Sequence, residues 1–340
     1  MTSLPSTLNV PSAPWRRVRR VLRGIGRTLA VLVGLLVVLG LVGMVYELAA
    51  EAADVRAYPP PGQLVDVGGY RLHINCVGTG SPTVVIDAGW GDWSGGWSRV
   101  QPEAAKTTRV CTYDRAGMGY SEPGPLPRTA EQFAKELHTL LQHAAIPGPY
   151  VLVGHSMGGA PVRVFAHTYA AEVAGVVLIE SMNPEGAGTP APATPPNSGA
   201  VSIVNKFLTN LLTLPARVGL VRLVTGPVAG MSPNDANTYM ARSVTVGSFQ
   251  AAIDEGRGMQ AGLAQAHRVT TLGSVPLIVL SRGLPEDGEQ KWQREQTELL
   301  HLSSNSQQVF AEQSGHNIQF DQPAAAVGAI VQMVAQLRQP

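Results

Sequence analysis

The sequence predicts an α/β protein in which helices cover both faces of a mostly parallel β-sheet, with a helical cap and one transmembrane helix ahead of the sheet. Short apolar runs alternate with helix-like segments from residue 64 onward, as repeated βα units do. Two of these runs are separated by about ninety residues, too many for an ordinary loop, which indicates an inserted cap. A stretch without charged residues, 29–46, precedes the whole arrangement.

The amino-terminal region has the charge and length of a membrane anchor. The chain has 340 residues and a net charge of +1, but residues 1–28 contain six arginines and no acidic residue, which leaves −5 on the remainder. The uncharged stretch is about as long as a bilayer-spanning helix. We expect a cytoplasmic basic tip (1–28) and a transmembrane helix (29–48) in the cell membrane, with the rest of the chain outside the cytoplasm, because arginines favour the cytoplasmic side.

Secretion after signal cleavage is the main alternative. The apolar region of a signal peptide usually runs for roughly 7–15 residues, shorter than this one, although the small residues at 49–53 offer a cleavage site. Residues 49–62 are expected to form a linker. Its closing prolines, Pro59 to Pro61, predict a stiff, extended spacer that holds the body off the membrane.

The body begins with a hairpin and a third strand. Residues 64–67 and 71–77 are strand-like and are joined by a Gly-Gly turn, and a third strand is expected over 83–87. The loop that follows the third strand is rich in tryptophan. Its three tryptophans either line an apolar pocket or pack the loop itself; they are Trp90, Trp93 and Trp97.

The next strand, 109–113, leads into a glycine-rich turn that carries Asp114 and Arg115. We interpret these two charges as structural, with Asp114 bonded either to turn amides or to Arg115. An amphipathic helix over 131–145 follows.

The two cysteines of the chain, Cys76 and Cys111, lie in strand-like runs. In an exported domain such a pair can form a disulfide. Two reduced thiols in the core fit the sequence nearly as well, because free cysteine is often buried.

The strongest chemical signal is the segment 154–159 (GHSMGG). It follows the apolar run 150–153 and precedes a helix-like stretch over 160–169. A G-x-S-x-G sequence between a strand and a helix is typical of a nucleophile elbow, a tight turn that exposes the serine hydroxyl. Glycines on either side leave the space the turn needs, and the start of the helix aims free amide groups at Ser156.

A strand over 174–180 ends in an acidic residue, and the next comparable strand is 275–280. Between them we assign a helical cap to 183–272, with helical patterns over 201–224 and 234–264. The first pattern is apolar, which suits a lid over an apolar pocket, a surface facing a membrane, or a helix packed on the body; its apolar residues include Phe207, Leu208, Leu211, Leu212 and Leu214.

The expected sheet domain comprises residues 63–182 and 273–340. Its last part contains a helix over 292–302, a strand over 307–312 and a final helix over 323–337. The turn after the last strand carries the sequence Ser-Gly-His at 314–316.

A serine nucleophile needs a base to accept its proton and an acid to orient that base. In a protein with a nucleophile elbow the chain order is serine, acid, histidine. His316 is the expected base because it follows the last strand and a glycine. His155 is excluded, because neighbouring side chains on an elbow diverge. Glu180, at the end of the strand after the elbow helix, is the expected acid.

The alternative acids, Glu286 and Asp287, follow the next strand, which is a more frequent site for the acid, but they come only after the four loop residues 282–285. Asp287 is taken as the alternative. Two backbone amides are expected to bind the oxyanion. One belongs to Trp90, just after the glycine of the loop behind the third strand, and the other to Met157, next to the serine.

From residue 59 to about 334 the chain resembles an α/β-hydrolase of the bacterial alpha/beta-fold hydrolase 1 type. The resemblance is carried by residues 84–89 (VVIDAG), 113–117 (YDRAG), 148–156 (GPYVLVGHS), 177–181 (VLIES) and 314–316 (SGH). It implies the α/β-hydrolase fold with an eight-stranded sheet and a serine hydrolase activity. Relatives commonly have aspartate at the position of Glu180 and often His-Gly in place of Ala88-Gly89.

We therefore expect a serine hydrolase that cleaves carboxylic esters by acyl transfer, with a small-molecule ester of an apolar acyl group as substrate. An amidase, peptidase or lactonase would use the same machinery, and a catalytically silent binding protein could keep the fold. A serine at the position where dehalogenases and epoxide hydrolases of this fold use aspartate argues against those reactions. No metal, cofactor or nucleic-acid partner is implied by the motifs present.

Overall fold

The computed structural model describes residues 13–183, 199–285 and 289–339. Eight strands form one sheet in the order β1-β2-β4-β3-β5-β6-β7-β8. β2 runs antiparallel to β1 and to β4, and the other neighbours pair in parallel. The strands are β1 Gln63–Asp66, β2 Arg71–Val77, β3 Thr83–Asp87, β4 Val110–Tyr113, β5 Tyr150–His155, β6 Val173–Ile179, β7 Leu277–Arg282 and β8 Ser306–Ala311.

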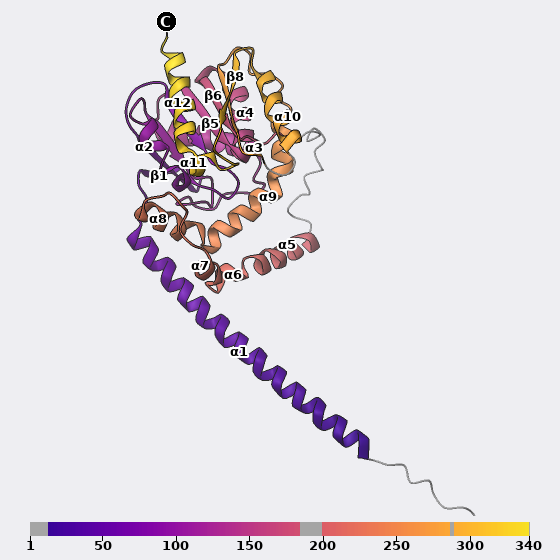
Figure 1. Ribbon diagram of the computed structural model, residues 1–340. Coiled ribbons are helices and arrows are strands. Elements are labelled where there is room, and N and C mark those ends of the chain that lie inside the picture. Colours follow the sequence, from indigo (N-terminus) through magenta and orange to yellow (C-terminus); the bar gives the residue numbers. More distant parts are fainter. Residues whose placement is uncertain (1–12, 184–198, 286–288, 340) are drawn as a thin grey trace, which may run out of the picture.

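The helices lie on both faces of the sheet and at one end of it (Figure 1). Short 3-10 turns occur at residues 94–97, 156–158, 170–172 and 300–302. The α-helices are α1 Ala13–Ala57, α2 Gln101–Ala104, α3 Ala130–His143, α4 Gly159–Thr168, α5 Gly199–Leu212, α6 Leu214–Arg217, α7 Leu220–Val224, α8 Pro233–Ser243, α9 Val246–His267, α10 Glu289–Leu299, α11 Ile318–Asp321 and α12 Pro323–Leu337.

Two apolar layers hold these helices to the sheet. Leu152 of β5 belongs to the layer that includes Leu137 of α3 and Phe165 of α4, while Val153 belongs to the layer with Ile330 of α12. Successive strand residues point to opposite faces, so a strand covered on both sides is apolar at every position. This explains why the central strands appear in the sequence as continuous apolar runs, and the predicted fold class is confirmed.

The two cysteines are joined. Cys76 of β2 lies opposite Cys111 of β4 in the antiparallel register, and the two form a disulfide. Of the two possibilities that the sequence left open, the structure has the disulfide.

The amino-terminal helix is longer than expected and is attached to the body. α1 includes a stretch, Val18–Ala57, that is long and apolar enough to be a candidate membrane span, with none of its most apolar window buried. The prediction of an extended spacer over 49–62 is wrong for 49–57, which continues α1. The reason is composition: five of these nine residues are alanine, the strongest helix former, and the prolines begin only at Pro59.

The carboxyl-terminal part of α1 packs against the cap. Arg222 of α7 pairs with Glu47 at 2.9 Å and with Asp54 at 2.7 Å, and Glu47 is buried. A side chain at Gly43 would overlap the carbonyl of Val218. The body is therefore fixed against the helix instead of being held off it.

Helices α5 to α9 lie between β6 and β7 in the chain. The single helical pattern expected over 201–224 is three helices, because Gly219 adopts a left-handed φ of 69° ahead of α7 and Pro215 opens α6. The pattern over 234–264 is two helices, since Thr245 caps α9 by accepting a hydrogen bond from the amide of Ser248. Residues 184–198 of the expected cap lie outside the described residues.

Candidate active site

Ser156 lies on the turn between β5 and α4, with a left-handed φ of +52°. This conformation is uncommon for a residue with a side chain, and the neighbouring glycines make room for it. A side chain at Gly154 would lie 2.7 Å from Gly159 Cα, and one at Gly158 would overlap the carbonyls of Asp87 and Ala88. The elbow is thus wedged between its own helix and the end of β3.

The structure brings the three expected side chains together. Ser156 Oγ lies 2.9 Å from His316 Nε2, and His316 Nδ1 lies 3.3 Å from Glu180 Oε2. These residues are 24 and 136 positions apart along the chain, but Ser156 and Glu180 follow neighbouring parallel strands, and His316 follows β8. Because parallel strands end at the same edge, the three meet there. Glu180 is fully buried, and His316 retains 30% side-chain exposure.

The carboxylate of Glu180 is held on two sides. Its backbone has a left-handed φ of 45°, its Oε1 accepts a hydrogen bond from the amide of Arg282 at 2.8 Å, and its Oε2 lies 3.1 Å from Arg282 Nη1. Arg282 was not expected from the sequence, since it lies 102 residues away. The alternative acid, Asp287, and its neighbour Glu286 lie outside the described residues.

His155 supports the loop that carries His316. Its Nε2 donates a hydrogen bond to the His316 carbonyl at 3.0 Å. Burial and the nearby His316 lower the pKa of His155 to about 3, so the ring stays neutral and its single proton serves this bond. The structure agrees that His155 does not face the serine as a base, but this positioning contact was not foreseen. The sequence carries no signal for this contact, because the acceptor is a backbone carbonyl that any residue type would supply.

The loop after β3 lies against the elbow. A side chain at Gly89 would lie 2.9 Å from His155 Nδ1 and 3.4 Å from Ser156 Cβ. Within the described part of the chain, neither the Trp90 amide nor the Met157 amide donates a hydrogen bond to another backbone group. That these two amides bind an oxyanion stays a prediction.

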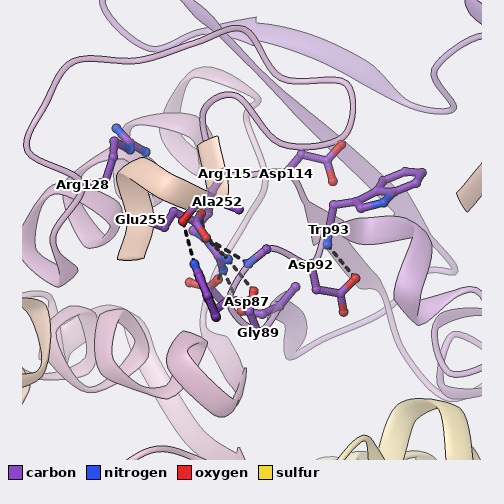
Figure 2. A network of polar contacts seen from close by, with 12 residues as sticks. Asp87, Gly89, Asp92, Trp93, Asp114, Arg115, Arg128, Ala252 and Glu255 are labelled. Carbon is purple, nitrogen blue, oxygen red and sulfur yellow. Dashed lines mark hydrogen bonds and ion pairs between the residues drawn. The ribbon is translucent and has the colours of Figure 1, made fainter. Parts of the chain in front are cut away.

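A buried arginine fixes this loop (Figure 2). Arg115 donates to Asp87 Oδ1 at 2.6 Å, to the Gly89 carbonyl at 2.6 Å and to Glu255 Oε1 at 2.7 Å. The other oxygen of Glu255 accepts from the amide of Gly91 at 3.1 Å. Arg115, Asp87 and Glu255 are all buried, and burial raises the pKa of Asp87 in spite of the arginine. The loop is thus tied to α9 of the cap by an ion network.

Asp114, in contrast, does not pair with Arg115. Its carboxylate accepts hydrogen bonds from the amides of Ser94 at 2.8 Å and Tyr120 at 3.0 Å and contacts His73 Nδ1 at 2.9 Å. Of the two roles expected for Asp114, bonding to turn amides or pairing with Arg115, the structure has the bonds to amides.

The tryptophans divide between packing and the site. Trp93 is buried, stacks on Tyr239 and donates to Ser243 at 3.0 Å, and Trp97 is buried against His155. Trp90 alone of the three is exposed, and its indole N–H donates to the Ala252 carbonyl of α9 at 2.7 Å. Trp93 and Trp97 therefore pack the loop, whereas Trp90 reaches the cap.

The space beside the nucleophile is narrow. A cavity of about 10 Å³ lies next to Met157, between α3, α4 and α9, and holds roughly one water molecule. It is lined by Arg128, Ala130, Phe133, Met157, Ala160, Pro161, Gly258, Met259, Gly262 and Leu263. Among the described residues, no group of three or more histidine, cysteine, aspartate or glutamate side chains could hold a metal ion.

Comparison with known proteins supports the fold. The family described as alpha/beta hydrolase fold matches residues 82–226, which contain the elbow and Glu180. The chain has the α/β-hydrolase fold. It is 28% identical over 249 residues to the uncharacterized protein YqjL of Bacillus subtilis, covering 72% of this chain and 81% of YqjL.

Two solved structures share the fold of this chain. The epoxide hydrolase CorEH has a TM-score of 0.62 at 21% identity, covering 81% of this chain and 99% of CorEH. A membrane phospholipase A has a TM-score of 0.61 at 17% identity, covering 95% of this chain and 100% of that protein. Identities this low show the fold alone.

The Arg115 network leads to a prediction for the loop after β3. Glu255→Gln keeps the shape of the side chain but removes the charge that holds Arg115. We expect the rate constant for acylation of Ser156 to fall about tenfold or more, with little change in KM, because a small misplacement of the oxyanion donors weakens only transition-state binding. Stopped-flow kinetics with an activated ester would measure this split.

Glu136→Gln is the matched control, since Glu136 is equally buried and pairs with Arg128 at 2.6 Å, away from the loop. Both variants should lose comparable thermal stability, but Glu136→Gln should retain the acylation rate. Equal losses of rate in the two variants would contradict a positioning role for the Arg115 network.

Proposed function

We propose that this protein is a membrane-anchored serine hydrolase that cleaves carboxylic esters by acyl transfer. The observation that carries the proposal is the continuous hydrogen-bonded chain from the Ser156 hydroxyl through His316 to the buried carboxylate of Glu180. A serine hydroxyl becomes nucleophilic when a base takes its proton, and a base gains strength when an oriented carboxylate stabilises its charged form.

In the proposed reaction, Ser156 Oγ attacks the ester carbonyl while His316 Nε2 takes the hydroxyl proton. The carbonyl oxygen becomes an oxyanion that accepts hydrogen bonds from the Trp90 and Met157 amides. The bond between the carbonyl carbon and the alkoxide oxygen then breaks, and His316 gives the proton to the alkoxide, which leaves as an alcohol. The acyl group remains on Ser156 Oγ. Water attacks the acyl-serine by the same route and releases the acid. Glu180 orients the imidazole of His316 and stabilises its charged form.

Ester substrates with an apolar acyl group are favoured by the surroundings of the site. The side chains around Met157 are mainly apolar, although the cavity between them is only large enough for about one water molecule, so an acyl group would need them to move apart. The similarity to a protein described as a membrane phospholipase A, which extends over 95% of this chain, adds support for an ester of this class. Amide and lactone bonds are open to the same machinery, so a screen of p-nitrophenyl esters of graded chain length, with matched anilides, would define the preference.

Anchoring through α1 is part of the proposal. Arg222 pairs with Glu47 before the small residues at 49–53 and with Asp54 after them, and cleavage between these partners would break one side of the pairing. This favours the interpretation of α1 as an uncleaved helix and not as a cleaved signal peptide. The Cys76–Cys111 disulfide supports a body on the oxidising, extracytoplasmic side, with residues 1–28 in the cytoplasm.

The nucleophile is tested by covalent labelling. A fluorophosphonate probe should label the full-length wild-type protein and should not label Ser156→Ala, because only the activated hydroxyl displaces the probe's leaving group. Labelling is read by in-gel fluorescence, with circular dichroism to establish that the variant is folded. A folded wild-type protein that takes up no probe would instead indicate a catalytically silent binding protein.

The acid is tested by two conservative substitutions. Glu180→Gln should lower kcat by about a thousandfold or more, because an amide can hold the wrong tautomer of His316 and cannot stabilise its charged form. Asp287→Asn should leave kcat within about threefold if the side chain has no part in orienting the base. The reverse order of losses would transfer the role of the acid to Asp287.

The topology is tested on intact cells. Protease added outside should digest the body and leave a fragment containing residues 1–28, since the amino-terminal tip lies behind the membrane. An epitope tag at the amino terminus, read by immunoblot, reports this fragment. Protection of the body until the membrane is opened, or release of the body into the medium, would rule out the proposed arrangement.

A further inference from the structure

The cap carries an exposed apolar surface that the proposed reaction does not use. Within the described residues and outside α1, thirteen large apolar side chains are exposed, and eight of them lie on α5, α6 and α7. These eight, between 43% and 73% exposed, form what is called here the cap face: Phe207, Leu208, Leu211, Leu212, Leu214, Leu220, Leu223 and Val224. Contiguous apolar surface of this kind marks a binding site for an apolar partner.

The position of the cap face relative to α1 identifies that partner. Gly43 of α1 abuts Val218, and the ring of Tyr46 lies against Gly219, so the α6–α7 turn touches α1 within its uncharged stretch, 29–46. At 1.5 Å per residue, Gly43 lies about 4.5 Å inside the end of that stretch. The turn is therefore level with the boundary between the acyl chains and the headgroups of any bilayer that α1 spans.

Figure 1 shows the same arrangement: α6 and α7 lie beside α1, and α5 extends from them away from α1. The contact is fixed by Arg222, which joins Glu47 and Asp54 of α1 to α7. Consequently the cap cannot lie far from the membrane surface while α1 is inserted.

The charge of the segment also suits a lipid surface. Residues 199–230 contain no acidic residue, and Lys206 and Arg217 add positive charge besides Arg222, which pairs with Glu47 and Asp54 of α1. Interfacial helices combine exposed apolar side chains with basic residues in this way, and they lie about 5–10 Å deep at the boundary between headgroups and acyl chains. Anionic lipid headgroups attract such segments.

We propose that the cap face docks into the lipid leaflet next to α1 on the side of the catalytic body. This inference rests on the proposed insertion of α1 and deepens the proposed function, because it makes the leaflet the source of the ester substrate. The cap face is also linked to the site: Arg257 of α9 donates to Thr209 of α5 at 2.7 Å, and α9 contacts Trp90 through Ala252. Docking of α5 would therefore hold α9, the helix that contacts the loop after β3 through Trp90.

Site-directed spin labelling tests the proposal on the full-length protein reconstituted in vesicles of equal parts phosphatidylcholine and phosphatidylglycerol. Single cysteines at Leu211→Cys and Leu223→Cys carry a nitroxide. Ala335→Cys, on an exposed position of α12 at the far end of the body in Figure 1, is the control. Power saturation measures how often each nitroxide collides with oxygen, which is enriched in lipid, and how often it collides with a water-soluble nickel chelate.

We expect the two cap labels to collide with the nickel chelate several-fold less often than the Ala335 label, and with oxygen more often. Equal access to the chelate at all three positions would overturn the proposal. Strong dipolar coupling between Leu223 labels on two chains, in vesicles at low protein density, would also overturn it and would assign the cap face to a second copy of the chain.

A substitution with a kinetic readout separates this proposal from the proposed function. Leu223→Glu combined with Val224→Glu should lower hydrolysis of a fluorogenic long-chain ester embedded in vesicles several-fold, while hydrolysis of soluble p-nitrophenyl acetate and fluorophosphonate labelling of Ser156 stay unchanged. Phe310→Glu, at an apolar side chain of comparable exposure outside the cap, should change neither. Unchanged hydrolysis of the vesicle substrate in the double variant would contradict docking, whereas loss of all labelling in the wild type would contradict the hydrolase.

Discussion

The backbone of Ser156 adopts a left-handed conformation that costs about 1–3 kcal/mol for a residue with a side chain, and the surrounding contacts hold it there. Gly154 and Gly158 permit α4 and the end of β3 to approach the turn so closely that no other residue would fit. The result is a hydroxyl presented at the edge of the sheet and an amide at Met157 without a backbone partner. Both the proposed nucleophile and half of the proposed oxyanion site follow from this one constraint.

Glu180, at the end of the neighbouring strand β6, also has a left-handed backbone conformation. It is one of three described non-glycine residues with a left-handed φ, and Ser156 is another. The turn at Glu180 directs its carboxylate along the edge of the sheet, where the Arg282 amide and guanidinium hold it. Strained residues persist only where their surroundings determine them fully. That two of the three belong to the same hydrogen-bonded chain indicates that the local backbone is arranged around this chain.

The sequence predicted most of the fold because the relevant signals are local. Every described strand lies within two residues of its expected bounds, since apolar runs and glycine turns mark strand ends directly. Ser156 could be found from five neighbouring residues, and His316 and Glu180 from the order of elements. Asp287, the other candidate acid, remains untested by the described residues.

Long-range partners could not be predicted in this way. Arg282 meets Glu180 across 102 residues, Arg115 meets Glu255 across 140, and His155 binds a backbone carbonyl 161 residues away. No pattern within any of these segments indicates its partner. Two of the pairs are created where parallel strands end at one edge of the sheet, and the Arg115–Glu255 pair is created by the packing of α9 against the loop after β3. The length of α1 was missed for a different reason: an alanine-rich stretch next to prolines was taken for a spacer, although alanine favours helix.

These long-range pairs also explain how the cap is held. Arg222 joins it to Glu47 and Asp54 of α1, Arg257 joins α5 to α9 through Thr209, and Glu255 of α9 pairs with the buried Arg115 next to the loop after β3. Apolar side chains of α9, such as Leu263, also pack in the core with α3 and α4. Buried ion pairs are directional, and removing one partner leaves an unpaired charge that is costly in a low dielectric. A cap held by such pairs has a defined orientation and is not free to slide. Its apolar side chains can then remain exposed, as a surface facing a membrane requires, without being needed for packing on the body.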